Sequence, residues 1–149
     1  MPNLFGDVPG AGIAVASKVN KVAIPATAGN VVFTHTVPAG HTQQLIFGHI
    51  TLTTDATAAD RRVVVGLYDE ADNMLMDIHA GATTPASQAS QHIEFMQGVY
   101  RETAFIAGTL QVPIPINFVA PAGYKFKITV DGGVAGDSYI GNLMIEDRD

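Results

Sequence analysis

Apolar and polar residues alternate along several short stretches of the chain, which is the pattern of half-buried β-strands. The alternation is clearest in residues 124–130, where Tyr124, Phe126, Ile128 and Val130 occupy one face and charged or polar residues the other. The same pattern in residues 74–80 and 90–96 predicts that Met74, Met76, Ile78, Ile93 and Phe95 face inward, with Leu75 as an apolar exception on the outer face. Strands of this kind have one face on a core and one in solvent, which favours antiparallel sheets.

Turn-forming residues separate the alternating stretches. We predict about eight or nine strands and no amphipathic helix. The strands are expected at residues 31–37, 42–54, 61–68, 74–80, 90–96, 114–119, 124–130 and 138–146, with a short hairpin or irregular strand within 103–112. This pattern predicts an all-β protein, an antiparallel β-sandwich, with a jelly roll as the first choice and an immunoglobulin-like sandwich as the second.

The first 29 residues differ from the rest, since they are rich in Ala, Gly, Pro and Asn and contain only short apolar pieces. We predict an extended N-terminal arm over residues 1–29, with at most one strand, and a β-sandwich domain over residues 30–149. Leu4, Phe5 and Val8 are costly to leave in water, so we expect them to contact a partner.

The stretch 42–54 is apolar on both faces under strict alternation. Leu45 and Phe47 fall on one face, and Ile46, Ile50 and Leu52 on the other. A strand of this kind is covered on both sides. We therefore expect Leu45 and Phe47 to contact the arm or a neighbouring subunit.

One turn sequence occurs twice, as Pro38-Ala39-Gly40 and as Pro121-Ala122-Gly123. Each follows an apolar strand and precedes another. Proline restricts φ, and glycine suits a position that needs a positive φ. We predict that both glycines adopt a positive φ.

The composition fits one domain with its own core: 149 residues, 15.7 kDa, 47% hydrophobic and only 15% charged. The absence of cysteine excludes disulfides, thiolate metal sites and thiol nucleophiles. The net charge is −6 and the basic residues are scattered, which disfavours nucleic acid as a direct partner. No apolar stretch approaches the roughly 20 residues of a membrane span, and the N-terminus lacks the basic residues of a secretory signal.

Two pairs of polar residues have the spacing of side chains that share one face of a strand, Asp77 with His79 and His92 with Glu94. If the two strands pair, four ligand-type side chains would cluster on the outer surface. The cluster could bind a metal such as zinc, form a pH-responsive subunit contact, or consist of ordinary cross-strand polar pairs. The last interpretation is preferred, so no metal ligand and no cofactor is assigned.

Other fragments of functional motifs are incomplete. His35 and His41 flank Pro38-Ala39-Gly40 as in part of the cupin motif, but its His-x-His and following Glu are missing. Residues 69–73 are similar to part of a calcium loop but lack its glycine and its terminal glutamate, so a turn is expected. There is no Gly-x-Ser-x-Gly and no phosphate loop. We expect no catalytic residues and no enzyme activity.

Four segments together resemble small virion structural proteins of tailed bacteriophages, of the head decoration (cement) type. They are residues 31–40, residues 52–65, residues 66–69 with Asp72-Asn73, and residues 120–124. The resemblance implies a jelly-roll protein on the capsid surface of a virion, made in the host cytoplasm. It would bind the major capsid protein, hold neighbouring capsid subunits together and form a homotrimer, with no direct nucleic-acid or membrane partner.

Two alternatives remain open. The chain could be another virion component, such as a tail, neck or receptor-binding protein, which is expected in few copies per particle. It could instead be a cupin-like or carbohydrate-binding β-sandwich, for which bound metal that depends on His79 and His92 would be the sign.

Overall fold

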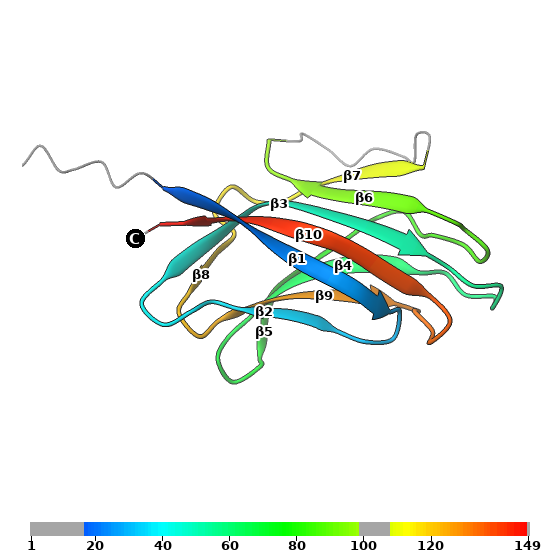
Figure 1. Ribbon diagram of the computed structural model, residues 1–149, viewed down its shortest axis with the longest axis horizontal. Helices are drawn as coiled ribbons and strands as arrows, with labels where there is room; N and C mark the ends of the chain where they lie inside the picture. The colour runs from blue at the N-terminus through cyan, green and yellow to red at the C-terminus, as the bar shows by residue number, and fades with distance from the viewer. Residues whose placement is uncertain (1–16, 99–107, 149) are drawn as a thin grey trace, which may run out of the picture.

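Two packed β-sheets make up the structure (Figure 1). The computed structural model describes residues 17–98 and 108–148, and these contain ten strands and no helix. The larger sheet has the order β1-β10-β3-β6-β7, with β8 also paired to β3, and the smaller sheet has the order β2-β9-β4-β5. The strands are β1 (Lys18–Ala28), β2 (Phe33–Thr36), β3 (Thr42–Thr53), β4 (Arg62–Tyr68), β5 (Met74–His79), β6 (Gln91–Met96), β7 (Thr109–Pro113), β8 (Val119–Pro121), β9 (Lys125–Asp131) and β10 (Ser138–Asp147).

The pairing of the strands is that of a jelly roll. Four antiparallel pairs are nested along the chain, from β1 with β10 on the outside through β2 with β9 and β3 with β6 to the hairpin of β4 with β5. Successive pairs alternate between the two sheets. Eight strands wound in this way form two interlocked Greek keys, the jelly-roll arrangement. The predicted fold class, an all-β sandwich of the jelly-roll type, is confirmed.

Strand β1 is an edge strand of the larger sheet and belongs to the sandwich. Lys18 pairs with Asp147 at one end and Ala28 with Ser138 at the other. Ile24 is 1% exposed and lies in the core. The prediction that all of residues 1–29 form an arm is therefore wrong for residues 18–28, because this stretch gains backbone partners along β10. The rest of the predicted arm, residues 1–16, lies outside the described residues.

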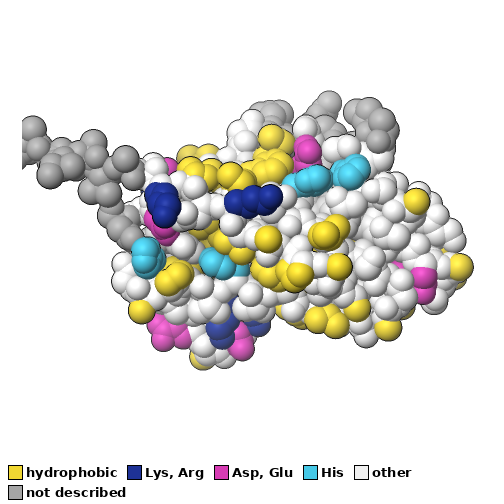
Figure 2. Space-filling view, in the orientation of Figure 1, with side chains coloured by type: hydrophobic (Ala, Val, Ile, Leu, Met, Phe, Trp, Pro, Cys, Tyr) yellow, Lys and Arg dark blue, Asp and Glu magenta, His cyan; other side chains and the backbone are white. Residues whose placement is uncertain are grey.

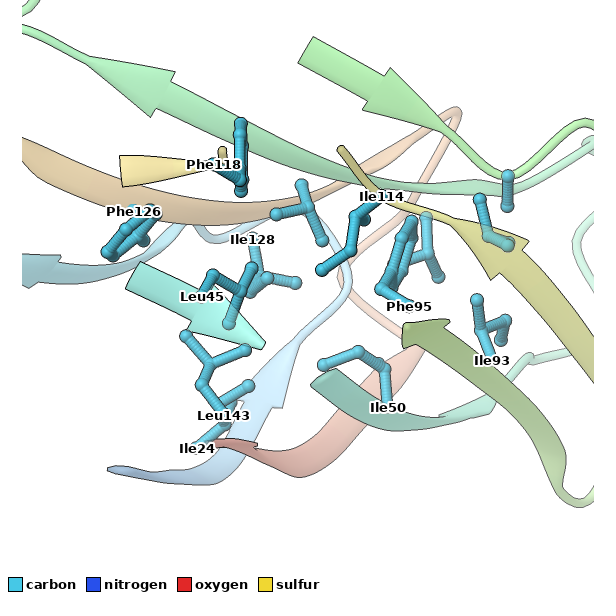
Figure 3. Packing of buried hydrophobic residues seen from close by; sticks show 14 of the residues in the cluster. Ile24, Leu45, Ile50, Ile93, Phe95, Ile114, Phe118, Phe126, Ile128 and Leu143 are labelled. Atoms are coloured by element: carbon cyan, nitrogen blue, oxygen red, sulfur yellow. The ribbon is translucent and has the colours of Figure 1, made fainter. Parts of the chain in front are cut away.

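A single hydrophobic core fills the space between the sheets (Figure 3). The predicted inward faces are confirmed for β9, where Phe126 and Ile128 are fully buried, and for β6, where Ile93 and Phe95 are. Phe118 packs on Phe126 with ring centroids 5.6 Å apart. In Figure 3, side chains from strands of both sheets interdigitate around Ile128 and Leu45.

A bulge in β3 changes which residues face the core. Leu45 pairs with Ile145 and Phe47 with Met144, so Ile46 is an extra residue between adjacent pairs. Such an insertion reverses the alternation on one side of the bulge. Leu45, Ile50 and Leu52 consequently all lie in the core at 0% exposure, whereas Phe47 is half-buried. The prediction that Leu45 contacts a partner is wrong, because the side chain is buried within its own subunit.

The two Pro-Ala-Gly turns adopt the same conformation and lie against each other. The amide of His41 donates to the carbonyl of Pro38, and the amide of Tyr124 to that of Pro121. Gly40 and Gly123 have φ values of +81° and +83°, as predicted for this turn chemistry. Val37 bonds to Tyr124 and to Gly123 through its amide and its carbonyl, which joins the two turns.

Residues 114–119 do not form the predicted strand. Pro113 and Pro115 flank the start of this stretch and cannot donate backbone hydrogen bonds to a central ladder. The segment instead forms a turn that inserts Ile114 and Phe118 into the core. The next strand, β8, begins only at Val119. Among residues 17–98 and 108–148 there is no helix long and apolar enough to cross a bilayer.

Candidate interaction surface

Three consecutive apolar side chains are exposed on β5, at the edge of the smaller sheet. Met74, Leu75 and Met76 are 56%, 53% and 42% exposed. Within the described part of the chain β5 pairs only with β4. We call these three residues the β5 patch. A run of large apolar side chains on an open sheet edge is a candidate surface for contact with another protein chain.

Local structure explains why the patch is exposed. Asp69 accepts hydrogen bonds from the amide and the side chain of Asn73, at 2.8 Å each, and these bonds close the turn before β5. These bonds also lower the pKa of Asp69. Met74 pairs with Tyr68 and Met76 with Leu67, so Leu75 is a bulged residue. Bulges on edge strands interrupt further pairing and redirect side chains.

The β5 patch corrects the predicted inward orientation of two methionines. Met74 and Met76 were expected to face inward, but they lie at the edge of the smaller sheet, where no further strand of residues 17–98 and 108–148 covers them. The sequence signal that could have revealed the patch is Leu75, which turns an alternating strand into an apolar run. Leu4, Phe5 and Val8 lie outside the described residues.

The two polar pairs singled out in the sequence lie in different sheets. Asp77 and His79 are on β5 of the smaller sheet, and His92 and Glu94 are on β6 of the larger one. They therefore do not form a four-residue cluster. His79 lies 2.7 Å from Asp77 and 3.4 Å from Asp131, and all three side chains are exposed in part.

The cupin-like histidines and the calcium-loop-like segment each make contacts within the fold. His35 Nε2 lies 2.8 Å from Gln43 Oε1, and His41 lies 3.5 Å from Asp147. Residues 69–73 form the expected turn, in which Asp72 has a φ of +67°. Hydrogen bonds from Lys125 and Lys127 lower the pKa of Asp72. In the described residues no three His, Asp or Glu side chains are placed to hold a metal ion together.

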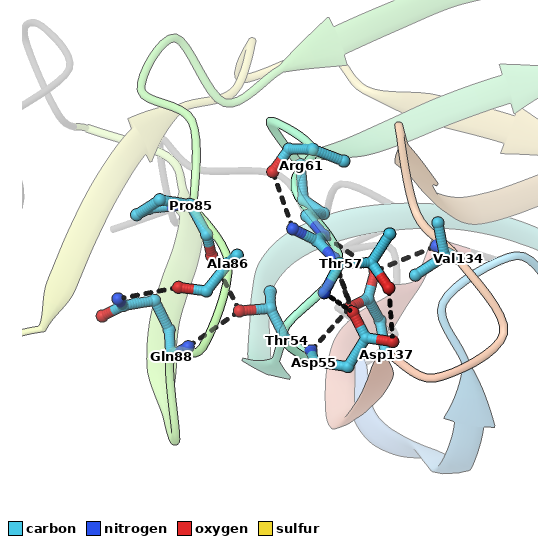
Figure 4. A network of polar contacts seen from close by, with 10 residues as sticks. Thr54, Asp55, Thr57, Arg61, Pro85, Ala86, Gln88, Val134 and Asp137 are labelled. Carbon is cyan, nitrogen blue, oxygen red and sulfur yellow. Dashed lines mark hydrogen bonds and ion pairs between the residues drawn. The ribbon is translucent and has the colours of Figure 1, made fainter.

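A buried charged network lies at the end of the sandwich where β3 leads into β4 and β9 into β10 (Figure 4). Arg61 and Asp137 are 0% and 1% exposed. The Arg61 guanidinium donates to the Asp137 carboxylate. It also donates to Asp55 and to the carbonyl of Ala59, at 2.9 Å and 2.7 Å. Buried charges often mark active sites. Here Arg61 and Asp137 bond to Asp55, Ala59 and Val134 in the neighbouring loops, so the network holds the loops together.

A shallow hollow lies on the surface beside the turn before β5. It measures about 210 Å³ and is lined by Asp69, Glu70, Ala71 and Tyr124. Pockets for organic ligands usually measure about 300–1,000 Å³. The hollow is too small and open to enclose a substrate, which leaves the β5 patch as the strongest candidate site.

Comparison with known proteins gives structural likenesses only. No protein-family model and no curated protein matches the chain. Its fold is similar to that of viral particle proteins. A chain of the infectious bursal disease virus particle is 15% identical with a TM-score of 0.42, and the match covers 87% of this chain and 31% of that chain.

A second solved chain, the VP2 subviral particle of the same virus, is also 15% identical, with a TM-score of 0.35. That match covers 89% of this chain and 33% of the other. The chain thus spans about a third of the length of the solved chains it matches. The likeness concerns the arrangement of strands.

Proposed function

We propose that this chain is a structural component of a virus particle, without enzyme activity, and that it acts as a decoration protein on the outer surface of a bacteriophage capsid. In this role it binds the major capsid protein, strengthens contacts between neighbouring capsid subunits and forms a homotrimer. The resemblance of its strand and turn segments to phage decoration proteins supports this specific role.

The observation that carries the proposal is the β5 patch. Its three side chains are about half exposed in the isolated chain, and burying each one fully would contribute on the order of 1 kcal/mol. The open edge of β5 also offers backbone donors and acceptors to a strand of the capsid protein. Contacts of this size are weak singly, but a trimer on a lattice makes them simultaneously, so retention on the capsid is strong.

The test is co-sedimentation of the purified chain with empty shells of the major capsid protein encoded in the same genome. The key variant is Leu75→Asp, which adds a charge to the β5 patch. The matched control is Ile140→Asp, because Ile140 is 52% exposed, like Leu75, but lies on β10 of the other sheet. Both variants should retain the wild-type unfolding temperature within a few degrees, since neither side chain is part of the core.

We expect wild type and Ile140→Asp to sediment with the shells and Leu75→Asp to remain in the supernatant. Equal binding of all three would overturn the role of the β5 patch. If Leu75→Asp instead dissociates the trimer in light scattering but its monomer still binds shells, the patch is a subunit contact. Deletion of residues 1–12 tests Leu4, Phe5 and Val8 separately: a folded oligomer that no longer binds shells is the expected result.

A further inference from the structure

A pair of histidines lies on the outer face of the larger sheet, away from the β5 patch. His49 is on β3 and His92 on β6, and the antiparallel register places them diagonally, since His49 pairs with Glu94 and Thr51 with His92. The Nε2 atom of His49 lies 3.2 Å from the Nδ1 atom of His92, and the ring centroids are 5.3 Å apart. Both side chains are partly exposed.

The spacing of the two nitrogens matches that of two ligands on one metal ion. Zinc–imidazole bonds are about 2.0–2.1 Å long, so two nitrogens at a tetrahedral zinc lie roughly 3.3 Å apart. The observed 3.2 Å already has this separation, so the nitrogens need not move apart. The two rings face each other nearly end to end, and both must turn so that their lone pairs point at a shared ion. In the metal-free pair, a hydrogen on one of the two facing nitrogens can bond to the other. Binding requires that hydrogen to sit on the far nitrogen of its ring.

The surroundings of the pair favour a cation. Glu94 lies on the same face directly beside His49 in the register, and the amide of Gln111 holds its carboxylate at 3.2 Å. The alternation along the strands puts Lys21 of β1 and Glu146 of β10 on this face as well, in other rows of the sheet. Thr51 Oγ1 lies 3.1 Å from His92 Nδ1 and is a further oxygen next to the pair. Figure 2 shows neighbouring histidines on this face, with an acidic side chain close by, open to the viewer.

We propose that His49 and His92 form a binding site for a divalent transition-metal ion of the imidazole-preferring class, such as Zn²⁺, Ni²⁺ or Cu²⁺. The two imidazoles are the protein ligands. Water completes the coordination, because the described residues do not bring a third His, Asp or Glu into a ligand set. Such an open site leaves positions that a side chain of a neighbouring molecule can occupy.

The test is isothermal titration of the full-length chain with zinc chloride at pH 7.5, with His49→Gln and His92→Gln as the variants. The matched control is His79→Gln, since His79 is a partly exposed histidine on the other sheet, beside Asp77 and Asp131. We expect one saturable site per chain, weakened at least about tenfold by either variant and unchanged in the control. Thermal unfolding without metal verifies that all three variants are folded.

Ring-nitrogen NMR spectra of the histidines give a second readout. Zinc should shift the resonances of His49 and His92 and leave those of His35 and His79 in place. The absence of saturable binding would overturn the proposal. So would binding that persists in both His49→Gln and His92→Gln, or binding that is lost in His79→Gln, which would assign the ion to β5.

Discussion

Arg61 and Asp137 form a bidentate ion pair that is closed to solvent. The Nε atom of Arg61 lies 2.9 Å from Oδ2 of Asp137, and one of its terminal nitrogens lies 3.0 Å from Oδ1. The backbone amides of Val134 and Asp55 donate to the same two oxygens, at 2.9 Å each. The Asp137 carboxylate therefore accepts four hydrogen bonds and connects the loop after β3 to the loop before β10.

Replacing Asp137 by asparagine should strongly destabilise the fold. Every group that faces the carboxylate is a donor, so an amide nitrogen in either orientation would meet donors, and Arg61 would lose its main counter-charge. Breaking one partner of a buried pair costs about 3–5 kcal/mol. The measurement is urea unfolding of Asp137→Asn. Its control is Asp131→Asn, in which the native carboxylate is exposed and the change should be within about 0.5 kcal/mol. Similar losses in both variants would contradict the account.

The same pair predicts how stability depends on pH. Burial tends to raise the pKa of Asp137, but the hydrogen bonds from Arg61, Val134 and Asp55 outweigh it and hold the pKa below the ordinary value of 3.8. The ionised form is thus favoured by folding, so its contribution is present above pH 3.8 and is lost as the pH falls through the lower folded value. The stability difference between wild type and Asp137→Asn should stay constant from pH 7 to pH 5 and shrink below pH 3.8. A difference that grows on acidification would mean that folding raises the pKa of Asp137 instead of lowering it.

The positive φ values in the two Pro-Ala-Gly turns predict how substitutions of their glycines affect stability. Gly40 has a φ of +81°, and a Cβ atom placed there would have open space around it. Gly40→Ala should therefore cost about 1–2 kcal/mol through its conformation alone. Gly40→Asn should cost less, because asparagine tolerates this conformation better. At Gly123 an added Cβ would lie 2.8 Å from Glu70 Cγ, so Gly123→Ala should cost at least as much as Gly40→Ala. Thermal denaturation of the three variants measures this order, and a neutral Gly40→Ala would refute it.

The bulge in β3 is tested by comparing Leu45 with Phe47. Leu45→Ala should lose about 2–5 kcal/mol of stability, because it removes fully buried methyl groups from the centre of the core. Phe47→Ala should lose less, because its side chain lies on the outer face and is half-buried. Chemical denaturation gives both values. A larger loss for Phe47→Ala would mean that the register of β3 differs from the one described.

The fold could be predicted to the extent that local periodicity determines it. The alternation in residues 124–130 identifies β9 and its inward face, and the repeated Pro-Ala-Gly sequence identifies two turns with a positive φ. Strand β1 could not be assigned to the sheet in the same way. Its apolar residues alternate poorly around Pro25, and its partner β10 lies more than a hundred residues away in the chain. Pairing at that distance is set by the whole fold.

The candidate sites could be predicted less well, for two physical reasons. Periodicity identifies the face of a strand on which Met76 lies, but it does not say whether another strand covers that face. At this sheet edge, no strand in the described part of the chain does. The bulge at Ile46 reverses the alternation, so a strict period of two misplaces Leu45. The contact of His49 with His92 likewise depends on the register between β3 and β6, which no local pattern specifies.

The most direct test of the proposed role is a count of this chain in purified virus particles, by quantitative mass spectrometry against the major capsid protein. A capsid decoration protein that forms trimers on the lattice should be present in many copies, in a simple fixed ratio to the major capsid protein. The absence of the chain from the particles, or a handful of copies per particle as for a tail component, would contradict the account.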